Sequence, residues 1–390
     1  MSQLDALKQI SEIVPETAAL SVVKRHGARH VSLSTGRITA AAQQPENEPI
    51  VDAAVLWAQR QVGKGGNRKL VAIRAVERLE LEFARALLEH VEGSVSLDVD
   101  GRLAFKRRQT IDRARAVLDQ LDELGVDKSR VFLKIPATWE GIEAARKLRE
   151  KDGARCHMTL VFGMHQLAAC ADAGASIIAP AVGRITDFHK KRDGVDRYPA
   201  PTDPGVLATK AMRDYLERHG YGSRLMPSMF RGTDQALALA GAELISLPSS
   251  LLDELASQEG DAESHFEPGG EERGADKIEV DAATFKKLHA ADELSKSKLQ
   301  SAVQNLSWGY VSQEKQLGEW ITKRQDVAAE SSTLALFRTW DYDGDGYIDR
   351  EEWNGTDDVF NALDRNNDGR ISLEEMAIGL GAPYQPEDDA

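Results

Sequence analysis

The sequence predicts an α/β protein in which a (β/α)8 TIM barrel is followed by a small all-α EF-hand pair. Short apolar runs typical of buried strands alternate with amphipathic helical segments over about 250 residues, as expected of right-handed βαβ units. Near the carboxyl end, two stretches repeat the pattern of an EF-hand loop. We therefore expect a barrel over residues 1–325 and an EF-hand pair with an acidic tail over residues 326–390.

Each strand prediction rests on a short apolar run bounded by turn residues. These runs cover residues 28–33, 94–99, 131–135, 156–162, 176–182, 225–230 and 243–247. Each helix prediction rests on apolar residues spaced three and four apart. These segments cover residues 4–14, 48–62, 69–91, 110–124, 139–151, 165–173, 204–219, 233–240 and 251–257. So many alternating units fit a barrel better than an open sheet.

Two segments follow the last predicted strand. Residues 258–276 are acidic and glycine-rich, which predicts an exposed loop, and residues 282–325 predict closing helices packed on the barrel. The apolar stripe of these helices, which includes Phe285 and Leu288, is typical of core packing. No G-x-G-x-x-G loop follows the first strand, which weakens a dinucleotide-binding alternative, and we expect no organic cofactor.

Composition and charge argue against several classes of protein. Cys156 and Cys170 are the only cysteines, which favours a reducing compartment, so the cytoplasm is the expected location. The start of the chain lacks a secretory pattern, and no apolar run approaches the roughly 18 residues of a membrane span. Residues 331–390, with fifteen acidic and four basic side chains, carry −11 of the net charge of −14. No basic stripe indicates nucleic acid.

One predicted strand organises the rest of the barrel. It covers residues 131–135 and is ended by Pro136, after which Thr138 caps a helix that stops at Gly153. Lys134 stands inside this apolar run, where burial should lower its pKa and leave a neutral, nucleophilic amine. The alternative is a lysine that extends its ammonium group to solvent, which is the commoner fate of a lone lysine.

Polar residues near the carboxyl ends of strands form the natural site of a TIM barrel. Here they are Ser34, Asp98, Lys134, His157, Thr159, Arg184 and Arg231, with Glu16 from the entry segment. Each residue alone could have a structural role, but together they are the groups that a catalytic site for a phosphorylated substrate requires. A neutral lysine attacks a ketone to form an iminium ion, an electron sink that lets the adjacent carbon–carbon bond break. Asp98 and Glu16 are candidate proton carriers, and the two arginines suit bidentate phosphate binding.

These residues give the chain a resemblance to transaldolase over roughly residues 1–325. L-K-I-P-A-T-W-E-G-I is similar to the family's Schiff-base lysine motif, and V-D-G-R-L, T-L-V-F, V-G-R-I and F-R are shorter matches. The resemblance implies an enzyme that transfers a dihydroxyacetone unit between sugar phosphates. It also implies Lys134 as the Schiff-base residue, Thr159 as a holder of the catalytic water, and Arg184 and Arg231 as phosphate ligands.

The two acid/base positions differ from the family pattern. The family's acid/base aspartate is Glu16 here, and the glutamate that works with the catalytic water is Asp98. Each change moves a carboxylate by on the order of 1 Å, a misplacement that can cost about a hundredfold in rate.

The substrate pocket also differs. The family's T-N-P-S turn reads L-S-T-G around Ser34, which loses an asparagine that binds sugar hydroxyls, and His157 replaces another asparagine. Ala179 and Met229 stand in place of two serines, and Ala181 in place of a phenylalanine. Lost hydroxyl contacts leave polar groups of the substrate unpaired, at about 1–3 kcal/mol each.

Two hypotheses follow from these differences. In the first, the chain is a transaldolase-like Schiff-base enzyme of the pentose-phosphate type with altered substrate preference or reduced activity. In the second, it is a catalytically inactive homologue that acts as a calcium-binding or interaction protein. The sequence does not decide the oligomeric state, and a homodimer is one possible assembly.

The acidic tail contains two full EF-hand loops. The expected calcium ligands of the first loop are Asp341, Asp343, Asp345, Tyr347 (by its backbone carbonyl), Asp349 and Glu352. Those of the second loop are Asp364, Asn366, Asp368, Arg370 (by its backbone carbonyl), Ser372 and Glu375. A merely solvated acidic run explains neither the glycine at the sixth position nor the isoleucine at the eighth of both loops.

The first loop has five carboxylates at ligand positions and the second has three, so we expect the first to bind calcium more tightly. Cyanobacterial-type transaldolases are similar in carrying such a pair after the barrel. Whether calcium regulates the barrel or only folds the tail is not decided by the sequence.

Overall fold

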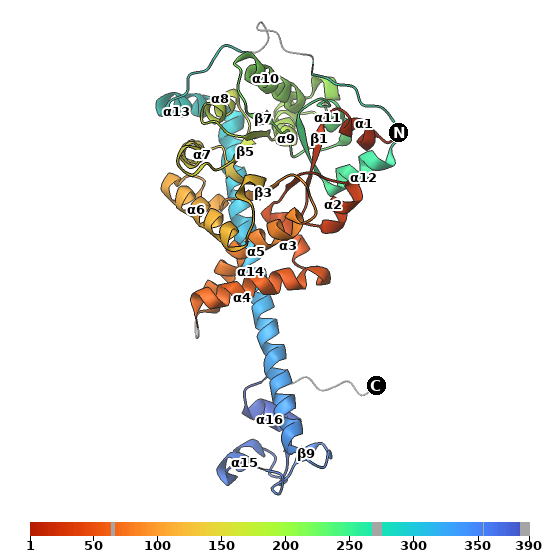
Figure 1. The fold of residues 1–390 in the computed structure, drawn as a ribbon, viewed down its shortest axis with the longest axis vertical. Coiled ribbons are helices and arrows are strands. Elements are labelled where there is room, and N and C mark those ends of the chain that lie inside the picture. Colours follow the sequence, from red (N-terminus) through yellow and green to blue (C-terminus); the bar gives the residue numbers. More distant parts are fainter. Residues whose placement is uncertain (64–66, 267–274, 354, 383–390) are drawn as a thin grey trace. The chain divides into compact units, whose positions relative to one another are not determined.

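A computed structural model describes residues 1–63, 67–266, 275–353 and 355–382. These residues belong to two compact units (Figure 1). The first unit comprises Met1–Gln61 and Ile73–Gln313, and the second comprises Val62–Ala72 and Glu314–Ala390.

The first unit is built on an eight-stranded parallel sheet in the order β7-β6-β5-β4-β3-β2-β1-β8. Its strands are β1 (Glu12–Glu16), β2 (Val31–Ser32), β3 (Val95–Asp98), β4 (Val131–Pro136), β5 (Cys156–Val161), β6 (Ile177–Pro180), β7 (Arg224–Leu225) and β8 (Leu244–Pro248). β1 pairs in parallel with β8. The Ser246 N–H also donates to the Pro227 carbonyl (3.0 Å), which links β8 to the segment after β7. The ring is thereby closed, which confirms the predicted barrel.

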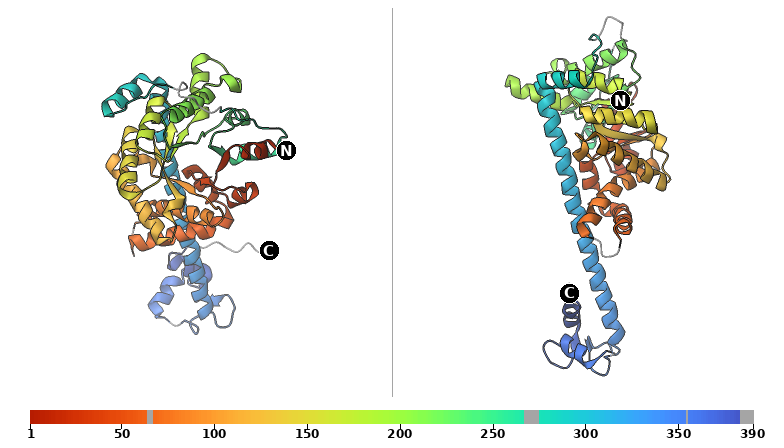
Figure 2. Two further views of the ribbon diagram at one scale, coloured as in Figure 1. Left: turned by 45° about the horizontal axis from the view of Figure 1, so that its top comes forward. Right: turned by 90° about the vertical axis from the view of Figure 1, so that its left-hand side faces the viewer.

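Helices surround the strands of this unit, as the two views of Figure 2 show. They are α1 (Gln3–Lys8), α2 (Leu20–His26), α3 (Thr35–Ala41), α4 (Glu48–Val62), α6 (Arg107–Glu123), α7 (Trp139–Asp152), α8 (Met164–Asp172), α9 (Val182–Asp193), α10 (Pro204–Arg218), α11 (Thr233–Leu237), α12 (Ser249–Ser257) and α13 (Ala282–Ala291), with those parts of α5 (Arg68–Leu88) and α14 (Glu293–Trp340) that belong to this unit. Among the described residues, no helix is long and apolar enough to cross a membrane.

The central strand and its helix follow the sequence prediction closely. Every residue of β4 is buried, as expected of a strand covered on both faces. The Thr138 hydroxyl accepts a hydrogen bond from the Gly141 N–H (2.9 Å) and so caps the start of α7. Gly153 ends this helix in the left-handed conformation, with φ of +63°.

The predicted helix over residues 4–14 is wrong in its second half. α1 ends at Lys8, and β1 begins at Glu12 and pairs along its whole length with β8. Pro15 cannot donate a helical backbone hydrogen bond, whereas Ile13 and Val14 are buried in the barrel. Helical spacing was therefore a weaker signal here than the need for a strand to complete the ring.

Three other boundaries differ from prediction. The strand predicted over residues 176–182 ends at Pro180, and α9, which was not predicted, begins at Val182. β7 has only two residues. The helices predicted to end near residue 325 continue, because α14 is one helix of 48 residues that reaches Trp340.

The second unit contains the end of α14 and two helix–loop pairs. Its other elements are β9 (Tyr347–Ile348), α15 (Asp357–Leu363), β10 (Ile371–Ser372) and α16 (Leu373–Gly379). Ile348 pairs with Ile371 in an antiparallel bridge. Both isoleucines belong to a small apolar core, whose other buried members are Phe337, Phe360, Leu363 and Met376.

Candidate active site and metal-binding loops

Strand register places three polar side chains next to one another inside the barrel. Asp98 at the end of β3 pairs with Lys134 of β4, and Lys134 pairs with His157 of β5. Side chains in register on neighbouring strands point to the same face of a sheet. All three line one cavity together with Glu16 of β1 and Ser246 of β8, so this shared face is the barrel interior.

A cavity of about 70 Å³ opens beside these side chains. Six of the sequence-predicted site residues line it, namely Glu16, Ser34, Asp98, Lys134, His157 and Thr159. Three hydroxyl groups that the sequence analysis did not single out also line it, those of Ser32, Ser228 and Ser246. Amine, carboxylates, imidazole and hydroxyls therefore converge on one small polar space.

Lys134 is held inside the barrel by two oxygen acceptors. Its Nζ donates a hydrogen bond to the carbonyl of Leu33 (2.6 Å) and lies 3.1 Å from Oδ1 of Asp98. The residue is only 8% exposed, so the alternative of a lysine that reaches solvent is wrong.

The pKa of Lys134 is raised, which corrects the prediction that it falls. Burial alone lowers this pKa, but the carboxylates of Asp98 and Glu16 act in the opposite direction and outweigh it. Glu80 contributes little at neutral pH, because its own pKa is raised to about 8 by burial and by the charge of Asp98. In the resting protein Lys134 is therefore an ammonium ion paired with Asp98.

His157 is a neutral imidazole that faces the cavity. Burial, together with the charge of Lys134, lowers its pKa well below the ordinary histidine value. Neither ring nitrogen has a hydrogen-bond partner within the part of the chain that the structure describes. Because buried polar atoms are nearly always hydrogen-bonded, these nitrogens indicate a place for a ligand or a water molecule.

The two predicted phosphate-binding arginines lie close to each other but do not line this cavity. The pKa of Arg184 is lowered by burial and by the charge of Arg231, which means that the two guanidinium groups are close enough to repel each other. Glu16 acts on Arg184 in the opposite direction, which places the arginine within electrostatic range of the cavity wall. Arg231 is held by the carboxylate of Asp187, with Nη2 to Oδ2 at 2.8 Å.

The backbone beside the cavity contains two residues in a strained conformation. Leu160 has φ of +61° and Met229 has φ of +59°, and both side chains line the cavity. Leu160 lies where the register of β5 and β6 shifts. A non-glycine residue at positive φ costs on the order of 1–3 kcal/mol and is concentrated at functional sites.

The sequence analysis missed two residues behind the site. Glu80 of α5 accepts a hydrogen bond from the Asp98 N–H (2.5 Å), and burial and the charges of Glu80 and Asp98 raise the pKa of Tyr310 of α14. A signal for Glu80 was present, because it interrupts the apolar face formed by Val76, Leu79 and Phe83. Tyr310 gave no comparable signal.

Comparison with known proteins agrees with this geometry. A family model described as Transaldolase/Fructose-6-phosphate aldolase matches residues 37–316. The chain belongs to this family. A curated transaldolase from Thermosynechococcus vestitus is 38% identical over 383 residues, which is 98% of both chains. Those from Gloeobacter violaceus (38% over 385 residues, 98% of both chains) and Synechocystis sp. (37% over 387 residues, 98% of this chain and 97% of the other) are similar over almost their whole length.

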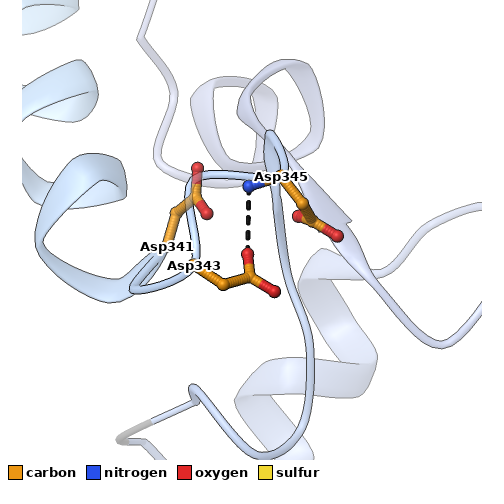
Figure 3. Close-up of side chains that lie close together, drawn as sticks. All are labelled: Asp341, Asp343 and Asp345. Atoms are coloured by element: carbon orange, nitrogen blue, oxygen red, sulfur yellow. Dashed lines mark hydrogen bonds between the residues drawn. The ribbon is translucent and has the colours of Figure 1, made fainter.

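The EF-hand family matches residues 335–355 and 356–378 of this transaldolase-family chain. In the first loop, the carboxylates of Asp341, Asp343 and Asp345 lie within 4.8 Å of one another, and the Asp345 N–H donates to Asp343 (Figure 3). Glu352 accepts hydrogen bonds from the backbone of Tyr342 (2.7 Å). The clustered carboxylates are the hard oxygen donors that calcium requires.

The second loop is organised in the same way with less charge. Asp364 accepts hydrogen bonds from the N–H groups of Asp368 (3.1 Å) and Gly369 (3.0 Å), and Gly369 has φ of +84°. Burial raises the pKa of Glu375, but hydrogen bonds from Ser372 and neighbouring backbone N–H groups outweigh it and leave the pKa lowered. Glu375 is therefore an ionised carboxylate ready to accept a cation.

The Lys134–Asp98 pair makes a prediction about stability and pH. Asp98→Asn removes the nearest opposing charge, so burial should lower the pKa of Lys134 relative to wild type. A raised lysine pKa stabilises the fold below the ordinary value of 10.5, and that stabilisation is lost as the pH rises through the folded-state pKa. The deficit of Asp98→Asn in free energy of unfolding, measured by urea denaturation, should therefore shrink as the pH rises beyond 10.5 and through the folded-state pKa.

Asp100→Asn is the matched control, because Asp100 lies two residues away and pairs instead with Arg102 (2.7 Å). Its deficit should stay constant over the same pH range. A constant deficit for Asp98→Asn as well would contradict the assignment of the raised pKa to Asp98.

Proposed function

We propose that Lys134 forms an imine with the carbonyl of a phosphorylated ketose and that the enzyme transfers the resulting dihydroxyacetone unit to an aldose phosphate. The observation that carries this proposal is the register of β3, β4 and β5, which brings Asp98, Lys134 and His157 to one cavity. Membership of a family whose curated relatives are named transaldolase supports the same reaction.

The resting ammonium of Lys134 has to lose a proton before it can attack a carbonyl. Asp98, at 3.1 Å, is the nearest acceptor, and a ketose that displaces the Leu33 carbonyl from Nζ would favour this transfer. The free amine then adds to the ketose carbonyl, and loss of water leaves the iminium ion. Asp98 and Thr159 line the cavity where this water would be held.

Glu16 is the proposed base for carbon–carbon cleavage. It lines the cavity at the carboxyl end of β1 and accepts a hydrogen bond from the Ser34 hydroxyl (3.3 Å). It would take the hydroxyl proton of the ketose as the bond breaks, so that this part of the sugar leaves as an aldose phosphate. The electron pair of the broken bond would form the double bond of an enamine, and the iminium nitrogen would become neutral. The enamine carbon would then add to the aldehyde carbon of the acceptor, and the proton would return from Glu16 to the oxygen of that aldehyde. Hydrolysis of the new iminium ion by water would release the product ketose and the Lys134 amine.

His157 and the arginine pair are the proposed substrate ligands. The unpartnered ring nitrogens of His157 would exchange hydrogen bonds with a sugar hydroxyl. Arg184 and Arg231 would bind the phosphate, since two neighbouring guanidinium groups repel each other until an anion lies between them. His157 replaces an asparagine of the family, and Ala179 and Met229 replace two serines, so the pocket offers different hydrogen-bond partners to a sugar. This difference supports an altered substrate preference.

We propose that both EF-hand loops bind Ca²⁺. The first would hold it with Asp341, Asp343, Asp345, Tyr347, Asp349 and Glu352, and the second with Asp364, Asn366, Asp368, Arg370, Ser372 and Glu375. The ion would neutralise clustered carboxylates and so stabilise the loops. A cytoplasmic location is part of the proposal and is supported by two free, buried cysteines.

The imine is tested by borohydride reduction in the presence of fructose 6-phosphate, followed by peptide mass mapping. We expect an adduct on the peptide that contains Lys134, no adduct in Lys134→Ala, and weaker trapping at low ketose concentration in His157→Ala. Lys128→Ala, an exposed lysine near the start of β4, should leave trapping unchanged. The absence of any adduct with a panel of ketose phosphates would favour the inactive, calcium-binding alternative.

Calcium binding is tested by calorimetric titration of the full chain. We expect Asp341→Ala to remove the tighter binding event and Asp364→Ala to remove the weaker one, because the first loop has more carboxylates at ligand positions. Asp357→Ala, which lies between the loops and pairs with Arg350, should leave both events unchanged. Loss of the tighter event in Asp364→Ala would contradict the predicted order.

A further inference from the structure

Glu80 is a buried acid in direct contact with the backbone of the site. It lies on the face of α5 that packs against the barrel and is 9% exposed. Its Oε1 accepts a hydrogen bond from the Asp98 N–H at 2.5 Å. Among the described residues it forms no ion pair, whereas Glu77 and Glu82 on the same helix are both paired with arginines. A glutamate this buried needs a reason other than charge pairing.

The groups that face Glu80 come from four elements around it. The charge of Asp98 of β3 raises its pKa. The hydrogen bond from the Asp98 N–H acts in the opposite direction, as do the charges of Lys134 of β4 and Arg113 of α6. Tyr310 of α14 is close enough that, in addition to the effect of burial, the charges of Glu80 and Asp98 raise its pKa. Burial and Asp98 dominate, so the pKa of Glu80 is raised to about 8. At neutral pH its carboxyl group is mainly protonated and uncharged.

We propose that Glu80 is a positioning residue of the catalytic centre, which as a neutral acid orients Asp98 through its backbone N–H and so holds Asp98 in its ion pair with Lys134. This inference rests on the proposed imine chemistry of Lys134. Loss of the Glu80 proton to solvent places a second negative charge behind Asp98. That charge holds the ammonium form of Lys134 more strongly and opposes release of the free amine.

The consequence is an alkaline loss of activity that belongs to Glu80. In Glu80→Gln the amide oxygen still accepts the Asp98 N–H, but the group has no proton to lose. The variant should react with ketoses at neutral pH much as wild type does and should keep reacting above pH 8. Glu80→Ala removes the acceptor and should react more slowly than Glu80→Gln at every pH, because the Asp98 N–H is left without its partner.

The decisive experiment is the pH dependence of borohydride trapping on Lys134 with fructose 6-phosphate. We expect the wild-type rate to fall above about pH 8 and the Glu80→Gln rate to stay level. At pH 9 the variant should exceed wild type by about tenfold, the factor that one ionisation produces one unit above its pKa. Glu82→Gln is the control, since it breaks a buried ion pair with Arg78 (2.8 Å) on the same helix and should keep the wild-type alkaline fall.

A second measurement does not depend on the reaction. A carboxyl group with a raised pKa favours folding below its ordinary value of 4.5, and this advantage is lost as the pH rises through about 8. The stability of Glu80→Gln relative to wild type should therefore increase between these pH values, measured by urea denaturation. Glu82→Gln should show no such increase.

The outcomes separate this inference from the proposed function. An adduct whose alkaline fall persists in Glu80→Gln, or a stability difference that does not change with pH, would overturn the role of Glu80 alone. An adduct that forms at no pH in wild type, together with the expected change in stability, would overturn the imine chemistry and with it the positioning role, but would leave the titration of Glu80 established.

Discussion

The contact between Lys134 and Asp98 is the interaction on which the rest of this structure depends. A buried ammonium ion is costly unless it is paired and hydrogen-bonded, and here a carboxylate at 3.1 Å and a carbonyl at 2.6 Å meet that requirement. The pairing is possible only because β3 and β4 are in register at these two residues. The barrel therefore positions its reactive group through the alignment of two adjacent strands.

In the proposed mechanism, Lys134 is stored as an ammonium ion and becomes the free amine when a ketose enters the cavity. Asp98, whose charge raises the pKa of Lys134, is also the group that would accept the lysine proton, so in this mechanism substrate binding and proton transfer are coupled. The shorter acid Asp98 still lies 3.1 Å from the amine, and its backbone N–H donates a hydrogen bond to Glu80. Six of the residues that depart from the family pattern line the same cavity, namely Glu16, Ser34, Asp98, His157, Ala179 and Met229.

The sequence predicted the elements whose formation depends on residues that are close together in the chain. The strand around Lys134, the cap at Thr138 and both EF-hand loops were predicted because their signals lie within a few neighbouring residues. The rise in the Lys134 pKa was not predicted. The burial that lowers this pKa can be inferred from the apolar strand itself, but the carboxylates of Asp98 and Glu16 that raise it come from other strands, whose positions the local sequence does not show. Glu80 was missed because its contact with Asp98 joins a helix to a strand.

The most direct test of this account is the protonation state of the Lys134 amine. Lysine labelled with ¹⁵N at Nζ would be followed by NMR as the pH is raised, with Lys134→Met used to assign the signal. The account predicts an ammonium ion that persists at about pH 10, close to the ordinary lysine pKa or beyond it. A signal that already belongs to a neutral amine near pH 7 would contradict it.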